Sequence, residues 1–144
     1  MRILGLLKAD AHTECGAPPN KELIERMGAF VEEMTEAGVM LATDGLQPSS
    51  KGKRIQLADG KITVIDGPFT ESKELVASYA VFQVKSMDEA VHWTTRFLQV
   101  PGRGECELRP IFEASDFPAE VFSPEQAEHE NAARQAMRRN AAKS

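Results

Sequence analysis

The side chains of this sequence that could do chemistry are densest in one short charged loop. The segment DGPFTESKEL, Asp66 to Leu75, holds three carboxylates and one lysine between two apolar stretches that we expect to be strands. Loops on a rigid strand framework often carry catalytic and binding groups. We therefore take Asp66 as a candidate general base, and Glu71 and Lys73 as candidate ligand-binding residues around a small polar substrate.

Each of these groups also has a purely structural interpretation. A carboxylate directly before Gly67-Pro68 is a common turn former, because its side chain accepts backbone N–H bonds. Glu71, Lys73 and Glu74 can form a solvated patch or an ion-pair cluster without any ligand. The residues alone leave both interpretations open.

Further polar candidates follow the other expected strands. Lys8 ends the first apolar run, and the turn-rich connection after the second strand contains Asp44, Gln47 and Ser49. His12 lies in the expected loop after the first strand, where it could reach the mouth of a cleft and exchange protons near neutral pH. We take Asp44 and His12 as further catalytic candidates, and Lys8, Gln47 and Ser49 as ligand-binding ones. A solvated, inert His12 is the structural alternative.

No metal or cofactor is expected. The three His and two Cys residues are scattered, without the spacing of metal ligands. The glycines fit neither a phosphate loop nor a dinucleotide fingerprint. Cys15 and Cys106 give no disulfide framework and suit a reducing compartment, with a redox pair as the alternative.

Composition limits the classes of function. The 144 residues suit a single main domain, and the net charge of -5 argues against nucleic-acid binding, which needs clustered Lys and Arg. The apolar run Ile3 to Leu7 is too short for a signal peptide or a membrane span. We expect a cytoplasmic protein.

Periodicity predicts an α+β order of elements. Apolar residues at three- and four-residue spacing predict a helix over Lys21 to Ala37, capped by Asn20, and Ser86 begins a second helix. The expected buried stripe of that second helix is Met87, Ala90, Val91, Phe97 and Leu98. Strands are expected over Ile3 to Leu7, Val39 to Thr43, Val76 to Lys85 and Glu105 to Glu113, with a hairpin turning at Asp59-Gly60.

The order β-α-β, hairpin, β-α-β predicts a ferredoxin-like fold with an inserted hairpin, in which two helices cover one face of an antiparallel sheet. Residues 1–117 would form this domain. Residues 118–144 would be an extension with a helix over Pro124 to Asn140. The apolar face of this helix is too small to hold it alone, so it either lies on a partner or frays.

The longest strand is apolar on both of its faces. Phe82 and Val84 would face the helices, while Tyr79 and Val81 would lie on the opposite face of the sheet. A water-facing sheet would carry polar residues there. We therefore expect a homodimer that buries Tyr79 and Val81.

Together with GLQPSSKG, Gly45 to Gly52, the DGPF segment resembles the DGPF-domain branch of the YCII-related proteins, from Met1 to about Phe117. The resemblance implies a dimeric α+β barrel and says little about a reaction. The broader family is thought to pair a His on its first helix with an Asp. The helix Lys21 to Ala37 contains no His, which leaves Asp44 or Asp66 for the acidic half.

Two functions from different classes follow. The first is binding or transforming a small polar or aromatic molecule, by acid–base chemistry, in a cleft near the DGPF loop. The alternative is a non-catalytic regulatory partner protein, which the resemblance links to sigma-factor-dependent transcription.

Overall fold

The structure is a computed structural model that describes residues 1–70 and 72–143 and divides into two compact units, Met1–Ile111 and Phe112–Ser144. The first unit contains, in chain order, β1 (Arg2–Lys8), α1 (Ala11–Glu14), α2 (Lys21–Glu36), β2 (Met40–Gly45), β3 (Lys53–Ala58), β4 (Lys61–Asp66), β5 (Val76–Gln83), α3 (Met87–Gln99) and β6 (Cys106–Pro110). The 3₁₀ turns η1 (Ser49–Lys51) and η2 (Ser72–Glu74) flank the hairpin.

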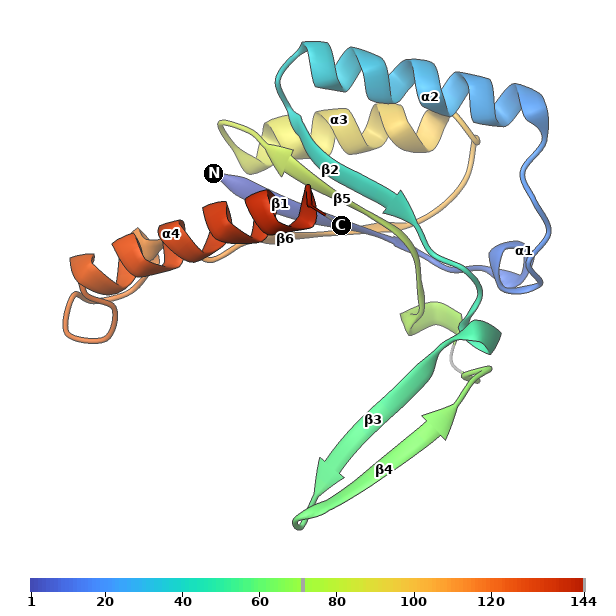
Figure 1. The fold of residues 1–144 in the computed structure, drawn as a ribbon. Helices are drawn as coiled ribbons and strands as arrows, with labels where there is room; N and C mark the ends of the chain where they lie inside the picture. The colour runs from blue at the N-terminus through green and yellow to red at the C-terminus, as the bar shows by residue number, and fades with distance from the viewer. Residues whose placement is uncertain (71, 144) are drawn as a thin grey trace. The chain divides into compact units, whose positions relative to one another are not determined.

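The main sheet has four antiparallel strands in the order β2-β5-β1-β6 (Figure 1). The predicted order of helices and strands is confirmed, and the unit is a mixed α+β fold. Strand β6 lies at an edge of the sheet, as Pro110 predicted, because proline cannot donate to a strand on its outer side.

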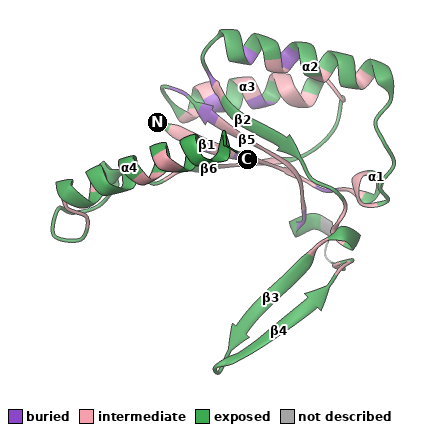
Figure 2. Cartoon of the chain, viewed as in Figure 1, coloured by how far each residue is buried: buried purple, intermediate pink, exposed green. Residues whose placement is uncertain are grey.

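Helices α2 and α3 cover one face of this sheet (Figure 1). Each begins at the predicted cap: Asn20 Oδ1 accepts from the Leu23 N–H at 2.8 Å, and Ser86 Oγ accepts from the Glu89 N–H at 3.1 Å. Most buried residues lie where the helices meet the sheet (Figure 2), and this core contains Ile3, Phe30, Met34, Val39, Phe82, Val84 and Ala90.

The buried stripe of α3 differs from the predicted one. Val91 is 49% exposed, whereas Thr94 is only 8% exposed and joins Ala90 in the interior. The spacing Met87, Ala90, Thr94, Phe97 keeps one helix face, and Val91 falls one residue away from it. The prediction was wrong at Val91 because it chose the more apolar residue type. The helical period places Thr94, not Val91, on the buried face.

The hairpin is confirmed in register and in turn geometry. Ile55 lies opposite Val64, Leu57 lies opposite Ile62, and the turn residues Asp59 and Gly60 have φ of 51° and 74°. Positive φ at both central positions is what a type I′ turn requires. Strands β3 and β4 form a separate two-stranded sheet in which every residue is exposed.

The sequence predicts a loop after β1. The structure instead has one helical turn there, over Ala11–Glu14. Asp10 Oδ1 accepts from the Thr13 N–H at 2.8 Å, while Thr13 Oγ1 accepts from the Asp10 N–H at 2.9 Å. This reciprocal cap satisfies donors that an uncapped turn would leave open.

The second unit contains the 3₁₀ turn η3 (Ala114–Asp116) and helix α4 (Pro124–Ala141). Ser123 and Gln126 form the predicted cap of α4, and Glu130 pairs with Arg134 along its surface. No described residue of α4 is buried. Among the described residues, none of the helices combines the length and apolar character needed to cross a membrane.

Candidate functional site

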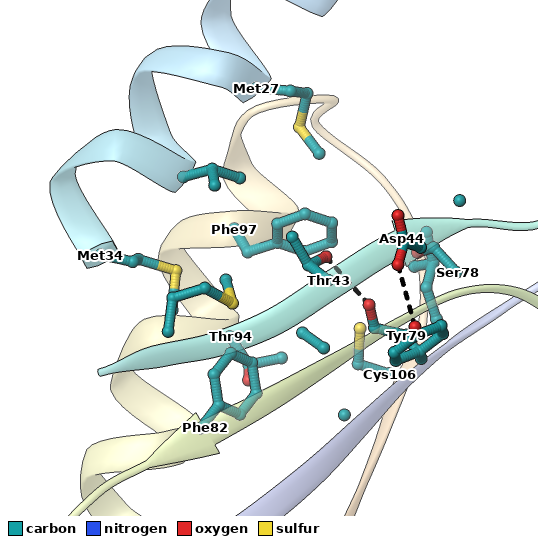
Figure 3. A pocket seen from close by; sticks show the side chains of 16 residues that line it. Met27, Met34, Thr43, Asp44, Ser78, Tyr79, Phe82, Thr94, Phe97 and Cys106 are labelled. Atoms are coloured by element: carbon teal, nitrogen blue, oxygen red, sulfur yellow. Dashed lines mark hydrogen bonds between the residues drawn. The ribbon is translucent and has the colours of Figure 1, made fainter. Parts of the chain in front are cut away.

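A cavity of about 200 Å³ lies between α2, α3 and the helix-facing side of the main sheet (Figure 3). Its walls are predominantly apolar. The lining residues are Gly5, Leu7, Met27, Val31, Met34, Met40, Thr43, Asp44, Gly45, Ser78, Tyr79, Ala80, Phe82, Thr94, Phe97 and Cys106. Ligand sites of proteins have this character, with apolar walls and a few polar groups that fix orientation.

The strand register explains which sheet residues form the floor. Gly5 pairs with Ala80 and Leu7 pairs with Ser78, so these residues share the helix-facing side. Gly5 leaves room for Phe82, because a Cβ there would lie 2.9 Å from Cε2 of that ring. The missing side chain and the small Ala80 help to keep the space between sheet and helices open.

Few polar groups reach this cavity. The Thr94 Oγ1 atom is buried and has no hydrogen-bond partner within the described part of the chain. Burial raises the pKa of the Cys106 thiol from its ordinary 9.0 to about 11, so the thiol stays protonated at neutral pH. Asp44 is the one charged residue in the described lining.

Asp44 and Tyr79 border the cavity at the β2 edge of the sheet. The Tyr79 hydroxyl donates to Asp44 Oδ2 at 2.9 Å, and that hydrogen bond to a carboxylate raises the pKa of Tyr79. The register pairs the two residues directly, on the face opposite Thr43 and Ala80. Thr43 Oγ1 donates to the Tyr79 carbonyl at 2.9 Å (Figure 3).

The DGPF segment lies at the base of the hairpin and packs against the PSSKG segment. A Cβ on Gly67 would lie 1.8 Å from the Ser49 carbonyl oxygen, so only glycine fits there. The Gly67 N–H donates to the Gly52 carbonyl at 3.1 Å, and the Arg54 guanidinium lies 4.1 Å from the centre of the Phe69 ring. The peptide bond between Gly67 and Pro68 is cis. The two motifs therefore interlock.

Ser49 joins this hairpin base to α1. Its Oγ donates to Glu14 Oε2 at 2.5 Å and accepts from the Phe69 N–H at 3.1 Å, while its backbone N–H donates to Glu14 Oε1 at 3.0 Å. Both donors of Ser49 are thus directed at a carboxylate. An anionic ligand would have to displace Glu14 to bind them.

A second, more open groove of about 530 Å³ runs past this hairpin base. It is lined by Glu14, Leu46, Gln47, Pro48, Ser49, Lys51, Gly52, Phe69, Leu75 and Val76. It brings together the predicted ligand-binding residues Gln47 and Ser49. Glu14 was not among our candidates, and its place in α1 gave it no distinguishing sequence signal.

The remaining candidates within the described residues do not gather around either space. Lys8 is directed to Glu107 and Glu74, at 3.7 and 3.9 Å, and Lys73 is exposed in η2. His12 is exposed on α1.

Asp66 forms an ion pair with Lys53 across the hairpin, with 74% of its side chain exposed. Glu71 lies outside the described residues. Of the three catalytic candidates, Asp44 alone borders the cavity.

Sequence reasoning missed five polar lining residues as site residues: Thr43, Ser78, Tyr79, Thr94 and Cys106. Thr94 had a usable signal, since it occupies an apolar position of the α3 period. Cys106 alternates with charged residues in β6, a pattern shared by any core residue of a strand. Within the described residues, no group of three His, Cys, Asp or Glu side chains could hold a metal ion.

The chain belongs to the YCII-related domain family, whose model matches residues 1–115. It is 26% identical to an uncharacterized protein of Rhizobium meliloti (strain 1021) over 93 residues, which are 64% of this chain and 75% of that protein. A solved structure with some likeness is 5-chloro-2-hydroxyhydroquinone dehydrochlorinase from Burkholderia phenoliruptrix AC1100, in complex with 2,5-dihydroxybenzoquinone. Its TM-score is 0.41 at 12% identity, covering 82% of this chain and 100% of that chain.

Proposed function

We propose that this protein binds, and transforms, one small ring-shaped molecule in the cavity between α2, α3 and the main sheet. The observation that carries the proposal is the cavity itself, about 200 Å³ of largely apolar space between the helices and the sheet, bordered by exposed residues of β2. Helices and sheets normally pack closely against each other, so a space of this size between them is a candidate binding site. An engineered apolar cavity of about 150 Å³ is known to hold benzene.

Acid–base chemistry at this site would run through Asp44. Asp44 is the one charged residue of the described lining, and its carboxylate accepts a hydrogen bond from the Tyr79 hydroxyl at the β2 edge of the sheet. A positioned carboxylate that accepts a proton from a bound hydroxyl is a general base. We assign this chemistry to Asp44 rather than to the cleft near the DGPF loop, because Asp66 forms an ion pair with Lys53 in the hairpin.

A thermal-shift screen with small hydroxylated aromatics and lactones tests the binding. We expect at least one neutral single-ring compound to raise the melting temperature. Ala80→Leu should abolish that shift by filling the cavity, and Ala42→Leu should preserve it, because Ala42 lies opposite Val81 on the other face and is exposed. A screen without hits, or shifts that survive Ala80→Leu, would contradict the proposal.

Turnover tests Asp44 separately from binding. For a compound that the protein transforms, Asp44→Asn should lower kcat by about 10²- to 10⁴-fold while the ligand-induced thermal shift remains. An unchanged kcat would remove Asp44 from the mechanism and leave the binding proposal standing.

The proposed assembly is a homodimer in which two ferredoxin-like sheets pair as a dimeric α+β barrel. The register places Leu4, Leu6, Tyr79 and Val81 on the sheet face opposite the core helices. The hairpin adds a second apolar face, since Ile55, Leu57, Ile62 and Val64 are 55–73% exposed. Two-fold pairing would remove such surfaces from water with one self-complementary patch.

Light scattering should report twice the chain mass of 15.8 kDa. Val81→Lys should lower that mass or destabilise the fold, whereas Thr63→Lys, on the other hairpin face from Ile55 and Leu57, should change neither. A wild-type monomer at micromolar concentration would rule out this assembly.

The competing proposal is a regulatory accessory role in which the segment 118–144 binds another protein. The observation that favours it is the eighteen-residue helix α4, none of whose described residues is buried. A stoichiometric protein partner that is recovered from the native host, and lost on deleting residues 124–144, would support it. Recovery of the same partner by the truncated chain would exclude it. In both proposals the protein acts in the cytoplasm without nucleic acid, in line with the net charge of -5.

A further inference from the structure

The least expected atom in the cavity wall is the Thr94 hydroxyl oxygen. Thr94 is 8% exposed, and its Oγ1 has no hydrogen-bond partner within the described chain. Helical threonines usually satisfy the hydroxyl on the carbonyl four residues earlier. Thr95 donates in this way to the Val91 carbonyl at 2.7 Å, and Thr35 to the Val31 carbonyl at 2.7 Å.

The neighbouring side chains of the cavity wall offer the Thr94 hydroxyl no partner. Met34, Phe82 and Phe97 line the same cavity and offer neither an oxygen nor a nitrogen atom (Figure 3). A buried polar atom without a partner is costly, and the large majority of buried side-chain polar atoms in known structures are hydrogen-bonded. A group that enters the cavity can supply the missing partner.

The charge of the lining restricts what that group can be. No Lys or Arg lines the cavity within the described residues, and its one charged residue is Asp44, whose side chain the strand register sets on the other face of the sheet. An anionic ligand would lose its hydration without gaining a counter-charge. The neutral thiol of Cys106 adds no charge either. The site therefore favours an uncharged molecule.

We propose that Thr94 selects the ligand of this cavity, because its Oγ1 exchanges a hydrogen bond with the hydroxyl or carbonyl group of a neutral single-ring molecule. A hydroxyl can accept from a phenol and donate to a carbonyl, so either group completes the bond. The inference rests on the proposed function and adds the class of ligand and the residue that recognises it.

Phenol and toluene provide matched probes, since they have nearly the same shape and differ in one hydrogen-bonding group. Thr94→Val removes the hydroxyl at constant size, and Thr94→Ser retains it. Fluorescence of Trp93, the single tryptophan, would report binding beside α3, with calorimetry as the second measurement.

The wild-type protein should prefer phenol to toluene by about tenfold, the worth of one neutral hydrogen bond. Thr94→Val should lose this preference while its affinity for toluene stays within about twofold, and Thr94→Ser should keep it. Without ligand, Thr94→Val should melt about 2–4 °C higher, because an unpartnered buried hydroxyl has been removed.

The outcomes separate this inference from the proposed function. If both probes bind but Thr94→Val keeps the preference for phenol, Thr94 does not contact the ligand and only this inference fails. A lower melting temperature for unliganded Thr94→Val would show that the hydroxyl already has a partner, which also overturns it. Binding of neither probe, together with a failed ligand screen, would count against the cavity as a site.

Discussion

The cavity beneath α2 and α3 and the base of the β3–β4 hairpin use opposite kinds of residues. The cavity is built largely from inconspicuous apolar side chains, such as Met34 and Phe82, that surround the buried oxygen of Thr94. The hairpin base contains the conspicuous DGPF and PSSKG motifs. There Gly67 and Ser49 meet through their backbones, and Asp66 pairs with Lys53.

This difference separates what a motif signals from what a site needs. The motifs mark a place where the chain must approach itself closely, and such contacts tolerate few residue types. A site for a neutral ring needs space and one or two polar atoms, which many sequences could provide. Substitutions at the cavity wall and at the hairpin base should therefore have different effects on stability and on ligand binding.

The largest effect is expected at the cavity wall. Met34 is 1% exposed, and Met34→Ala should lower the free energy of unfolding by about 2–5 kcal/mol, because buried contacts are lost and the surroundings relax only in part. Met137→Ala is the control, since Met137 is 68% exposed and should change stability by less than about 0.5 kcal/mol. Urea unfolding of both variants provides the measurement. Equal effects would mean that the wall does not belong to the core.

A somewhat smaller effect is expected at the hairpin base. Gly67→Ala should cost about 2–3 kcal/mol, because its Cβ would lie 1.8 Å from the Ser49 carbonyl oxygen and the two segments would have to separate. Gly28→Ala, in α2, meets nothing within 4 Å and should stabilise the protein by about 0.5–1 kcal/mol. Hydrogen exchange should show the loss at residues 48–52 and 66–69. An undisturbed hairpin in Gly67→Ala would refute the interlocking of the two motifs.

Local patterns predicted the fold well because its elements carry local signals. The cap at Ser86, the Asp59-Gly60 turn and the edge position of Pro110 each express a constraint within a few residues. The sequence did not predict the turn at Ala11–Glu14. Its cap depends on reciprocal hydrogen bonds between Asp10 and Thr13, and these residue types are equally common in loops.

The candidate site was less predictable, because a cavity is a property of packing rather than of any residue. Gly5 and Ala80 leave space only when the register sets them side by side under the helices. Asp66 attracted attention by its type, yet the hairpin register directs it to Lys53. Thr94 could have been found, as the one polar residue on the apolar face of α3.

The two cysteines allow the cavity and the surface to be compared within one chain. Burial raises the pKa of Cys106 to about 11, so about one thousandth of it is thiolate at pH 8, whereas Cys15 is exposed. Iodoacetamide at pH 8 should modify Cys15 at least tenfold faster, and a bound ligand should slow only Cys106. Mass spectrometry of the labelled peptides distinguishes the two sites. Equal rates would place Cys106 in open contact with water.

The same pKa predicts a dependence of stability on pH. A thiol whose pKa is raised on folding, from 9.0 to about 11, holds its proton more tightly in the folded state. Its contribution to stability is present below pH 9 and is lost as the pH rises from 9 to 11. Unfolding curves of wild type and Cys106→Ser across this range should therefore converge as the pH rises. A constant difference would contradict the raised pKa.

The smallest effect is expected at Asp66, the most conspicuous residue of the DGPF motif. Its side chain is 74% exposed and that of its partner Lys53 is 63% exposed, and exposed ion pairs contribute at most about 1 kcal/mol. Asp66→Asn should therefore cost less than about 1 kcal/mol, with a smaller effect at high salt, and should leave the ligand-induced thermal shift unchanged. Asp44→Asn is the matched control at the edge of the cavity. It should lower turnover and leave the Asp66–Lys53 ion pair intact. If Asp66→Asn abolished binding or turnover while Asp44→Asn retained both, the functional site would lie at the hairpin base, and the contrast between the two regions would be reversed.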